Sequence, residues 1–301
     1  MRILKARYFG MCFGVRDAID LALEQAQHEP LTILGDLVHN ESVMAQLRSR
    51  GIHVARNAAD VTTRKVMVTA HGASDTAIRN ARERGFLVTE ATCPLVHLAH
   101  RAVAKLVRDG YHPLIVGKRD HVEVRGITED LAECDVILTA EDVAQLRERP
   151  RFGVVAQTTQ PIDRVRGLVE LLRTRFPAAE VCFVDTVCQP TKQRQASAIE
   201  TAQESDVMIV IGGVNSNNTR ELAETCAKYC AHVYHVQTST DLRSEWFEAA
   251  GTVGITAGTS TPDSLVSEVE NWLRKWAMQT TPGGVSVRER SLAVMSNLKA
   301  A

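Results

Sequence analysis

The 301-residue sequence lacks an excess of charge of either sign. Lysine and arginine together number 35 and aspartate and glutamate 36, so the formal net charge at pH 7 is -1. Proteins that bind nucleic acid or an anionic membrane surface through bulk charge carry a strong basic excess. The sequence therefore predicts neither kind of partner, and any anionic ligand must be held by local groups.

Long hydrophobic runs are also missing. Apolar stretches such as Val-Met-Ile-Val-Ile at 207–211 are far shorter than the roughly 20 residues that a helix needs to cross a bilayer. Residues 1–7 alternate like a β-strand and contain no apolar segment of the kind found in a secretory signal. We therefore expect a soluble, cytoplasmic protein with no membrane partner.

Paired cysteine motifs are absent as well. The chain has seven cysteines, none of them in a Cys-x-x-Cys motif. In a cytoplasmic protein, an odd number of cysteines argues against a disulfide framework and favours free thiols or metal ligands. A structural zinc site usually uses such pairs and is disfavoured here, whereas a catalytic zinc with three protein ligands remains open.

What the sequence does contain is an alternation of short β-rich runs and helical patterns, which predicts an α/β fold with mostly parallel strands. In open parallel sheets, ligands bind beyond the carboxyl ends of the strands. Residues that can bind ligands or take part in catalysis follow these β-rich runs more often than expected if the loops were simply polar. They include His39, His71, Cys93, His121, Glu123, Thr158, Cys188, Ser216 and Ser260.

Three cysteines share one context. Cys12, Cys93 and Cys188 each follow a strand-like run and precede a helical pattern. The free N–H groups and the dipole at a helix N-terminus favour a thiolate over a thiol. A lone cysteine is more often a small buried residue, but three at similar intervals predict three similar domains that each offer one thiolate to a common centre. We expect domains at 1–92, 93–184 and 185–278, with a tail at 279–301.

The other four cysteines have a simpler interpretation. Cys134, Cys182, Cys226 and Cys230 are expected to be buried thiols. Cys226 and Cys230 are four residues apart and would share a helix face, but no further histidine or cysteine nearby supports a metal site there.

Three thiolates without an obvious fourth fit an iron–sulfur cluster that has one iron without a protein ligand. Zinc is the rival metal. The spacing of the cysteines leaves both open.

Nine segments, in order over about residues 1–275, resemble the LytB/IspH family of 4-hydroxy-3-methylbut-2-enyl diphosphate reductases. One such string is weak evidence, whereas nine in order are highly specific. The segments are 9–19, 38–40, 70–72, 91–94, 121–124, 157–159, 188–195, 215–218 and 257–263.

The resemblance implies three α/β domains arranged pseudo-threefold, like a trefoil, around a central 4Fe–4S cluster. It implies reductive removal of a hydroxyl from an allylic diphosphate to give isopentenyl and dimethylallyl diphosphates, the last step of the non-mevalonate isoprenoid pathway. The iron without a protein ligand would bind the substrate hydroxyl, and its loss would leave a 3Fe–4S cluster. An electron donor such as ferredoxin or flavodoxin is implied as the partner.

The resemblance also implies roles for individual residues. Cys12, Cys93 and Cys188 would hold the cluster. Glu123 would supply a proton through Thr158 or through the substrate's own diphosphate, and Asn40 and Thr159 would support the site. The predicted substrate-binding residues are His39, His71, His121, Thr158, Ser216, Asn217, Asn218 and Ser260.

Two alternatives remain. A non-catalytic iron–sulfur redox sensor on the same fold would explain the cysteines, but it has no need for three histidines and Glu123. A divergent paralogue acting on another allylic phosphate is permitted by departures from the family pattern, namely Val122 and Pro161, and above all Asn217 where the family usually has serine.

Overall fold

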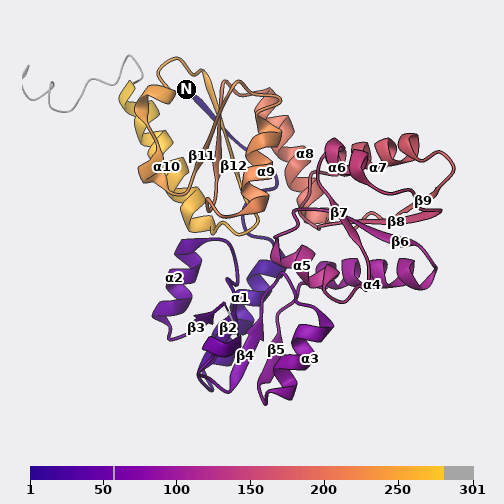
Figure 1. The fold of residues 1–301 in the computed structure, drawn as a ribbon. Coiled ribbons are helices and arrows are strands. Elements are labelled where there is room, and N and C mark those ends of the chain that lie inside the picture. The colour runs from indigo at the N-terminus through magenta and orange to yellow at the C-terminus, as the bar shows by residue number, and fades with distance from the viewer. Residues whose placement is uncertain (57, 281–301) are drawn as a thin grey trace, which may run out of the picture.

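The fold was analysed in a computed structural model that describes residues 1–56 and 58–280. In this part of the chain, twelve strands form three four-stranded sheets, and all paired strands run parallel. The sheets lie in three lobes that meet near the middle of the molecule (Figure 1). The predicted class of three similar α/β units with parallel sheets is confirmed.

The first sheet has the order β3-β2-β4-β5. Its strands are β2 (Leu31–Leu34), β3 (His53–Ala55), β4 (Lys65–Val68) and β5 (Leu87–Glu90). The helices of this lobe are α1 (Phe13–Ala26), α2 (Glu41–Ser49), α3 (Asp75–Glu83) and the short 3-10 helix η1 (Ala58–Asp60). Ala22 of α1 and Leu47 of α2 share a buried cluster with Ile33 of β2, so both helices cover this sheet.

The second sheet has the order β7-β6-β8-β9. Its elements are α4 (Pro94–Arg108), β6 (His112–Val116), α5 (Val122–Thr128), β7 (Asp135–Ile137), α6 (Ala140–Gln145), β8 (Arg151–Ala156), α7 (Ile162–Arg175) and β9 (Glu180–Phe183). Alternate residues of a strand point to opposite faces of its sheet. Accordingly, Leu114 packs in the cluster that contains α6 and α7, and Ile115 packs in the cluster that contains α4 and α5.

The third sheet has the order β1-β12-β10-β11. Its elements are β1 (Arg2–Lys5), α8 (Gln189–Gln203), β10 (Val207–Ile211), α9 (Asn217–Cys226), β11 (His232–Val236), η2 (Ser239–Asp241), η3 (Ser244–Trp246), β12 (Thr252–Ala257) and α10 (Asp263–Thr280). Ile209 packs with α10 on one face, whereas Met208 packs with α8 and α9 on the other.

The placement of β1 corrects the predicted domain division. We expected residues 1–92 to form one domain, but Ile3 lies opposite Val253 and Leu4 opposite Gly254, so β1 belongs to the third sheet. It covers an edge of β12 that would otherwise present unpaired backbone groups. The boundaries near residues 92 and 184 remain a proposal, and the predicted tail lies outside the described residues from residue 281 onward.

With β1 included, the three sheets have equivalent strand orders. The edge strands β5, β9 and β1 occupy the same position in their respective sheets. Each is followed by a helix that packs on the next sheet: α4 on the second, α8 on the third and α1 on the first. The chain therefore passes from one lobe to the next at three equivalent junctions. No helix of the described chain is long and apolar enough to cross a membrane.

Candidate active site

Each of the three junctions carries one of the predicted cysteines. Cys12, Cys93 and Cys188 are the N-cap residues of α1, α4 and α8, and none of their side chains caps its helix by a hydrogen bond. All three thiols are free and partly buried. The N-terminal placement predicted from the sequence is therefore confirmed at all three positions.

The backbone holds these cysteines in the same way three times. The amide of Cys93 donates to the carbonyl oxygen of Ala70 at 3.0 Å, the amide of Cys188 to Thr158 at 2.9 Å, and the amide of Cys12 to Thr259 at 3.0 Å. Ala70, Thr158 and Thr259 lie in the loops that follow β4, β8 and β12, respectively. The cysteine of each junction is thus tied to a loop that carries predicted substrate-binding residues.

The three cysteine segments lie against one another. A Cβ atom built on Gly14, in the first turn of α1, would lie 2.5 Å from Sγ of Cys93. The Arg194 guanidinium donates to the carbonyl oxygen of Gly10 and to that of Pro190, which flank Cys12 and Cys188. These contacts bring the segments around Cys12, Cys93 and Cys188 to one centre.

The predicted ionisation of the thiols needs correction. Burial raises the pKa of the Cys93 thiol, although the backbone N–H groups of Leu95 and Val96 act in the opposite direction. Burial likewise raises the pKa of Cys188 to about 11, against a hydrogen bond to Thr191. Desolvation outweighs the helix dipole here, so in the metal-free chain these two thiols are protonated, and metal binding must displace their protons.

The three predicted histidines converge beside this centre. The ring centroids of His39 and His71 are 4.9 Å apart, those of His71 and His121 5.4 Å, and those of His39 and His121 5.7 Å. His39 follows β2, His71 follows β4 and His121 follows β6. Two sheets therefore contribute imidazoles to one cluster, as expected from the carboxyl ends of parallel strands.

The histidine cluster is neutral in the free protein. Burial is the main cause of a lowered pKa at all three histidines. It lowers the pKa of His39, lowers that of His71 well below the usual value, and lowers that of His121 to about 3. His121 caps α5 with Nδ1, which accepts the amide of Glu123 at 3.2 Å. Its proton is therefore on Nε2, where it is free to be donated to a ligand.

Glu123 is the buried carboxyl group of the site. Its side chain is only 1% exposed. Oε1 accepts the backbone amide of Thr158 at 2.7 Å, and Oε2 lies 2.9 Å from the Thr158 hydroxyl, which donates to it. Burial raises the pKa of Glu123 to about 7, while the hydrogen bonds from Thr158 oppose that rise. A carboxyl group with this pKa holds its proton at neutral pH more readily than an exposed glutamate does.

Polar side chains without partners complete the site from the third lobe. The Ser216 hydroxyl caps α9 by accepting the amide of Thr219, so its proton is still available. Nδ2 of Asn217, Nδ2 of Asn218 and Oγ of Ser260 are buried without a hydrogen-bond partner in the described chain, as is Nε2 of His71. Such groups are costly unless a ligand satisfies them, and all of these were predicted to bind the substrate.

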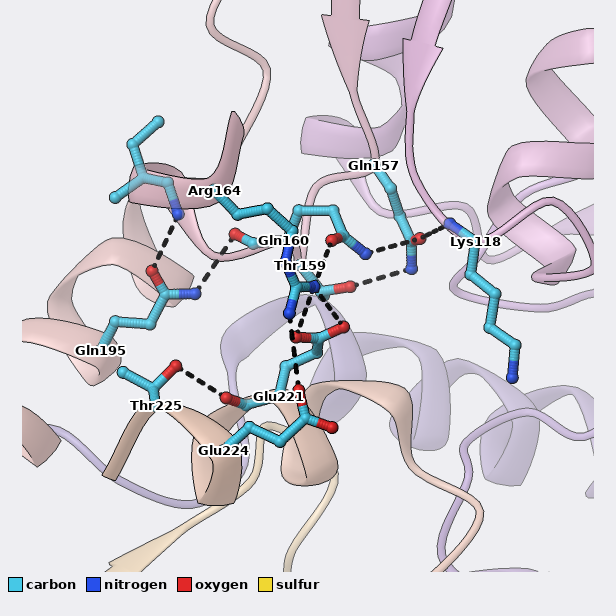
Figure 2. Close-up of polar contacts among 10 residues, drawn as sticks. Lys118, Gln157, Thr159, Gln160, Arg164, Gln195, Glu221, Glu224 and Thr225 are labelled. Carbon is cyan, nitrogen blue, oxygen red and sulfur yellow. Dashed lines mark hydrogen bonds and ion pairs between the residues drawn. The ribbon is translucent and has the colours of Figure 1, made fainter. Parts of the chain in front are cut away.

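A polar network holds the loop that carries Thr158 (Figure 2). Oε1 of Gln157 accepts from the amide of Lys118 at 3.1 Å and from Nε2 of Gln160 at 3.2 Å. Arg164 donates to Oε1 of Gln160 and to both carboxylate oxygens of Glu221 in α9. The loop between β8 and α7 is thereby linked to the helix that begins at Ser216 and Asn217.

This network also shows what sequence reasoning missed. Gln157 and Gln160 are fully buried, and Gln195 of α8 binds the carbonyl oxygen of Gln160 and the amide of Ile162. The resemblance included Gln157, Arg194 and Gln195, but no role followed for them, because burial of a polar residue leaves no local pattern in a sequence.

Asn40 and Thr159 make local hydrogen bonds, and two of the four remaining cysteines, all expected to be buried, are buried. Oδ1 of Asn40 caps α2 by accepting the amide of Val43, and Oγ1 of Thr159 accepts from Gln157. Cys226 and Cys230 are buried in the apolar cluster beneath α8 and α9, while Cys134 and Cys182 are partly buried. Within residues 1–56 and 58–280, no three His, Cys, Asp or Glu side chains are arranged to hold a single metal ion.

Known proteins match this chain over most of its length. A family model described as LytB protein matches residues 3–274. A 4-hydroxy-3-methylbut-2-enyl diphosphate reductase of Trichlorobacter lovleyi is 39% identical over 276 residues, which are 91% of this chain and 98% of the relative. One of Geobacter sulfurreducens is 38% identical over 272 residues, covering 89% of this chain and 95% of the relative.

Two solved structures are also similar to this chain over most of its length. One described as (E)-4-hydroxy-3-methyl-but-2-enyl diphosphate reductase, the terminal enzyme of the non-mevalonate pathway, matches with a TM-score of 0.66 and 33% identity over 91% of this chain and 100% of its own. A reductase structure from Plasmodium falciparum matches with a TM-score of 0.85, covering 95% of this chain and 90% of its own. At 24% identity, the second match bears on the fold alone.

Proposed function

The chain belongs to the LytB protein family, and on that basis we propose that it reductively dehydroxylates 4-hydroxy-3-methylbut-2-enyl diphosphate to isopentenyl and dimethylallyl diphosphates. The proposal depends on one observation: the three junction cysteines, the three histidines and the buried Glu123 come together in one region where the three lobes join. Equivalent loops of three parallel sheets supply these groups, so the site is built into the fold.

The donor set fits an iron–sulfur cluster. Three cysteines lie at three helix N-termini, in segments joined by the Gly14–Cys93 contact and by the hydrogen bonds of Arg194 to Gly10 and Pro190. Three thiols without a fourth protein ligand suit an iron–sulfur cluster with one open iron better than a structural zinc site, which would need a fourth ligand. Cys12, Cys93 and Cys188 would hold a 4Fe–4S cluster, which would supply electrons one at a time and a Lewis-acidic iron without a protein ligand.

The diphosphate is held by neutral donors from three lobes. His39, His71 and His121 supply imidazole N–H groups, while Ser216, Asn217, Asn218 and Ser260 supply hydroxyl and amide protons from the third lobe. The buried donors without partners support this role. A bound diphosphate would also raise the pKa of the histidines, because a nearby negative charge favours their protonated forms.

Glu123 and Thr158 deliver a proton to the substrate hydroxyl. Replacing C–OH by C–H and releasing water consumes two electrons and two protons, one of which must reach the leaving oxygen. With the carboxyl group protonated, Oε2 of Glu123 can donate to the Thr158 hydroxyl at 2.9 Å, and that hydroxyl can donate its own proton onward. The substrate's own diphosphate is the second route for a proton. The electrons come from a donor such as ferredoxin or flavodoxin.

The proposal is tested with enzyme purified without oxygen. We expect about four iron and four sulfide ions per chain, and conversion of the allylic diphosphate to both products with reduced methyl viologen as electron donor. Cluster-loaded protein that leaves this substrate unchanged would overturn the proposal in favour of a redox sensor. Conversion of a different allylic phosphate alone would favour the divergent paralogue.

The ionisation of Glu123 predicts the pH dependence of the reaction. Because burial raises the pKa of Glu123 to about 7, the acid is protonated below that pH and loses its proton above it. We expect kcat/KM to fall as the pH rises through about 7. Measurement of kcat/KM between about pH 6 and 8 checks this, and the residual activity of Glu123→Gln should lack the same transition. A wild-type profile that rises through this range would contradict the assignment.

Gly213 is predicted to set the width of the diphosphate site. A Cβ atom on this residue would lie 2.3 Å from the carbonyl oxygen of His39 and 3.3 Å from Cα of Asn40. Gly213→Ala should therefore push the loop after β10 away from the loop after β2, at a cost of about 1–3 kcal/mol in substrate binding, or roughly a 5- to 150-fold rise in Kd. Titration calorimetry with the diphosphate measures this change.

The matched control is Gly167→Ala in α7, where an added Cβ meets no atom within 4 Å. It should leave the Kd unchanged. An unchanged Kd for Gly213→Ala would show that the two loops can separate without harm to the site.

A further inference from the structure

Arg194 is a buried charge without a carboxylate partner. Its side chain belongs to α8 and the residue is 8% exposed. In the described chain its hydrogen bonds go only to carbonyl oxygens: Nε and Nη2 donate to Gly10 at 3.0 and 2.6 Å, and Nη1 donates to Pro190 at 3.1 Å. Carbonyl oxygens satisfy its donors but do not neutralise its charge.

The two acceptors place Arg194 between two cysteine segments. Gly10 lies two residues before Cys12, and Pro190 lies two residues after Cys188. Gly10 has a positive φ of 67°, and its amide donates to Ala257 at 3.1 Å. One guanidinium therefore joins the segment that enters α1 to the first turn of α8, although Gly10 and Arg194 are 184 residues apart in the chain.

A buried charge is tolerated when an opposite charge is close to it. Burial lowers the pKa of Arg194 and the charge of Arg16 adds to that lowering, whereas Cys12 and Cys188 act in the opposite direction when they are ionised. Arg16 itself is ion-paired with Asp263 at 2.9 Å, and its side chain is half exposed. In the described chain Arg194 hydrogen-bonds to no carboxylate, so the negative charges that would offset its own are the thiolates that Cys12 and Cys188 form when they bind a cluster.

We infer that Arg194 is the counter-charge of this centre, raising the reduction potential of the bound cluster and clamping the Cys12 and Cys188 segments around it. The inference rests on the proposed function, because it requires a cluster at these cysteines. Reduction adds an electron to an anionic group, so a fixed positive charge in a dry environment favours the reduced form. Arg194 is a positioning residue in this role.

The test compares reduction potentials of anaerobically purified holoenzymes. At the midpoint potential of the wild type, we expect the ratio of reduced to oxidised cluster in Arg194→Gln to be about tenfold lower, which is 59 mV for a one-electron couple. The ratio is measured by visible absorbance in an equilibrium redox titration, after iron and sulfide quantitation. Arg194→Lys keeps the charge and should stay within about threefold of the wild type.

Arg16→Gln is the matched control. It removes a charge beside Cys12 that is already paired and exposed to solvent, so its ratio should change by less than about twofold. An equal shift in Arg16→Gln and Arg194→Gln would overturn the inference, because any nearby charge would then do the same.

The remaining outcomes separate this inference from the proposed function. Wild-type protein without iron and sulfide would overturn both. Arg194→Gln with a full cluster and an unchanged ratio would overturn the inference alone. If Arg194→Gln does not retain the cluster, the result for Arg194→Lys tests the inference instead. A retained cluster with a near-normal ratio of reduced to oxidised cluster would support the inference, and loss of the cluster would refute it.

Discussion

Glu123→Gln is expected to lower kcat by about 10²- to 10⁴-fold, the usual contribution of a general acid, and to leave the iron content unchanged. Glutamine has nearly the same shape and can still accept the Thr158 amide through its carbonyl oxygen. It cannot release a proton to the Thr158 hydroxyl. Because Glu123 is 1% exposed, bulk water is a poor substitute for the missing acid.

The measurement is turnover of the allylic diphosphate with reduced methyl viologen, alongside the visible spectrum and iron analysis of the same sample. Glu141→Gln, in the first turn of α6, controls for loss of a carboxylate elsewhere in the second lobe. Thr158→Ser should keep activity because the hydroxyl remains, whereas Thr158→Val should lose it. Full activity of Glu123→Gln would show that the proton comes from another group.

The residues of the candidate site could be predicted because parallel α/β sheets have a fixed polarity. Loops after β2, β6 and β10 carry His39, His121 and Ser216, and loops after β4, β8 and β12 carry His71, Thr158 and Ser260. All these loops leave a sheet at the carboxyl ends of its strands. The order of runs along the sequence therefore indicated which side chains would follow the carboxyl ends of the strands before any contact was known.

The partner of an edge strand could not be predicted in the same way. The run at residues 1–7 looked like the start of the first domain, yet β1 pairs with β12, about 250 residues away (Figure 1). Alternation of apolar and polar residues indicates that a segment is a strand. Its pairing partner depends on which sheet has an unpaired edge in the folded chain. Once β1 completes the third sheet, Cys12 becomes equivalent to Cys93 and Cys188.

Burial is the other quantity that the sequence left undetermined. A helix N-terminus favours a thiolate, but the structure buries Cys188 enough to raise its pKa to about 11. The same holds for Arg194 and Gln160, whose polar side chains look like surface residues in the sequence and lie inside the protein. Desolvation depends on all three lobes together, so no local pattern records it.

Cys93→Ser is expected to abolish retention of cluster iron and, with it, all turnover. Cys93 is the N-cap of α4, with Pro94 at the next position, and its Sγ lies against the first turn of α1 at Gly14. Serine oxygen is a far poorer ligand for iron in a cluster than thiolate sulfur. Loss of one of three protein ligands should therefore remove the cluster rather than alter its behaviour.

The same substitution should not unfold the helix. Serine is among the favoured N-cap residues and can accept a hydrogen bond from a first-turn amide, which is worth about 1 kcal/mol, whereas the Cys93 side chain makes no cap hydrogen bond. We expect apoprotein Tm values of Cys93→Ser and wild type to agree within a few degrees, since about 1 kcal/mol shifts Tm only slightly in a chain of this size. Iron and sulfide quantitation after anaerobic reconstitution is the measurement, with Cys134→Ser as the control that keeps its cluster. Iron and sulfide contents equal to those of the wild type would refute the ligand role of Cys93, and since the three junctions are equivalent, they would also remove the basis for assigning that role to Cys12 and Cys188.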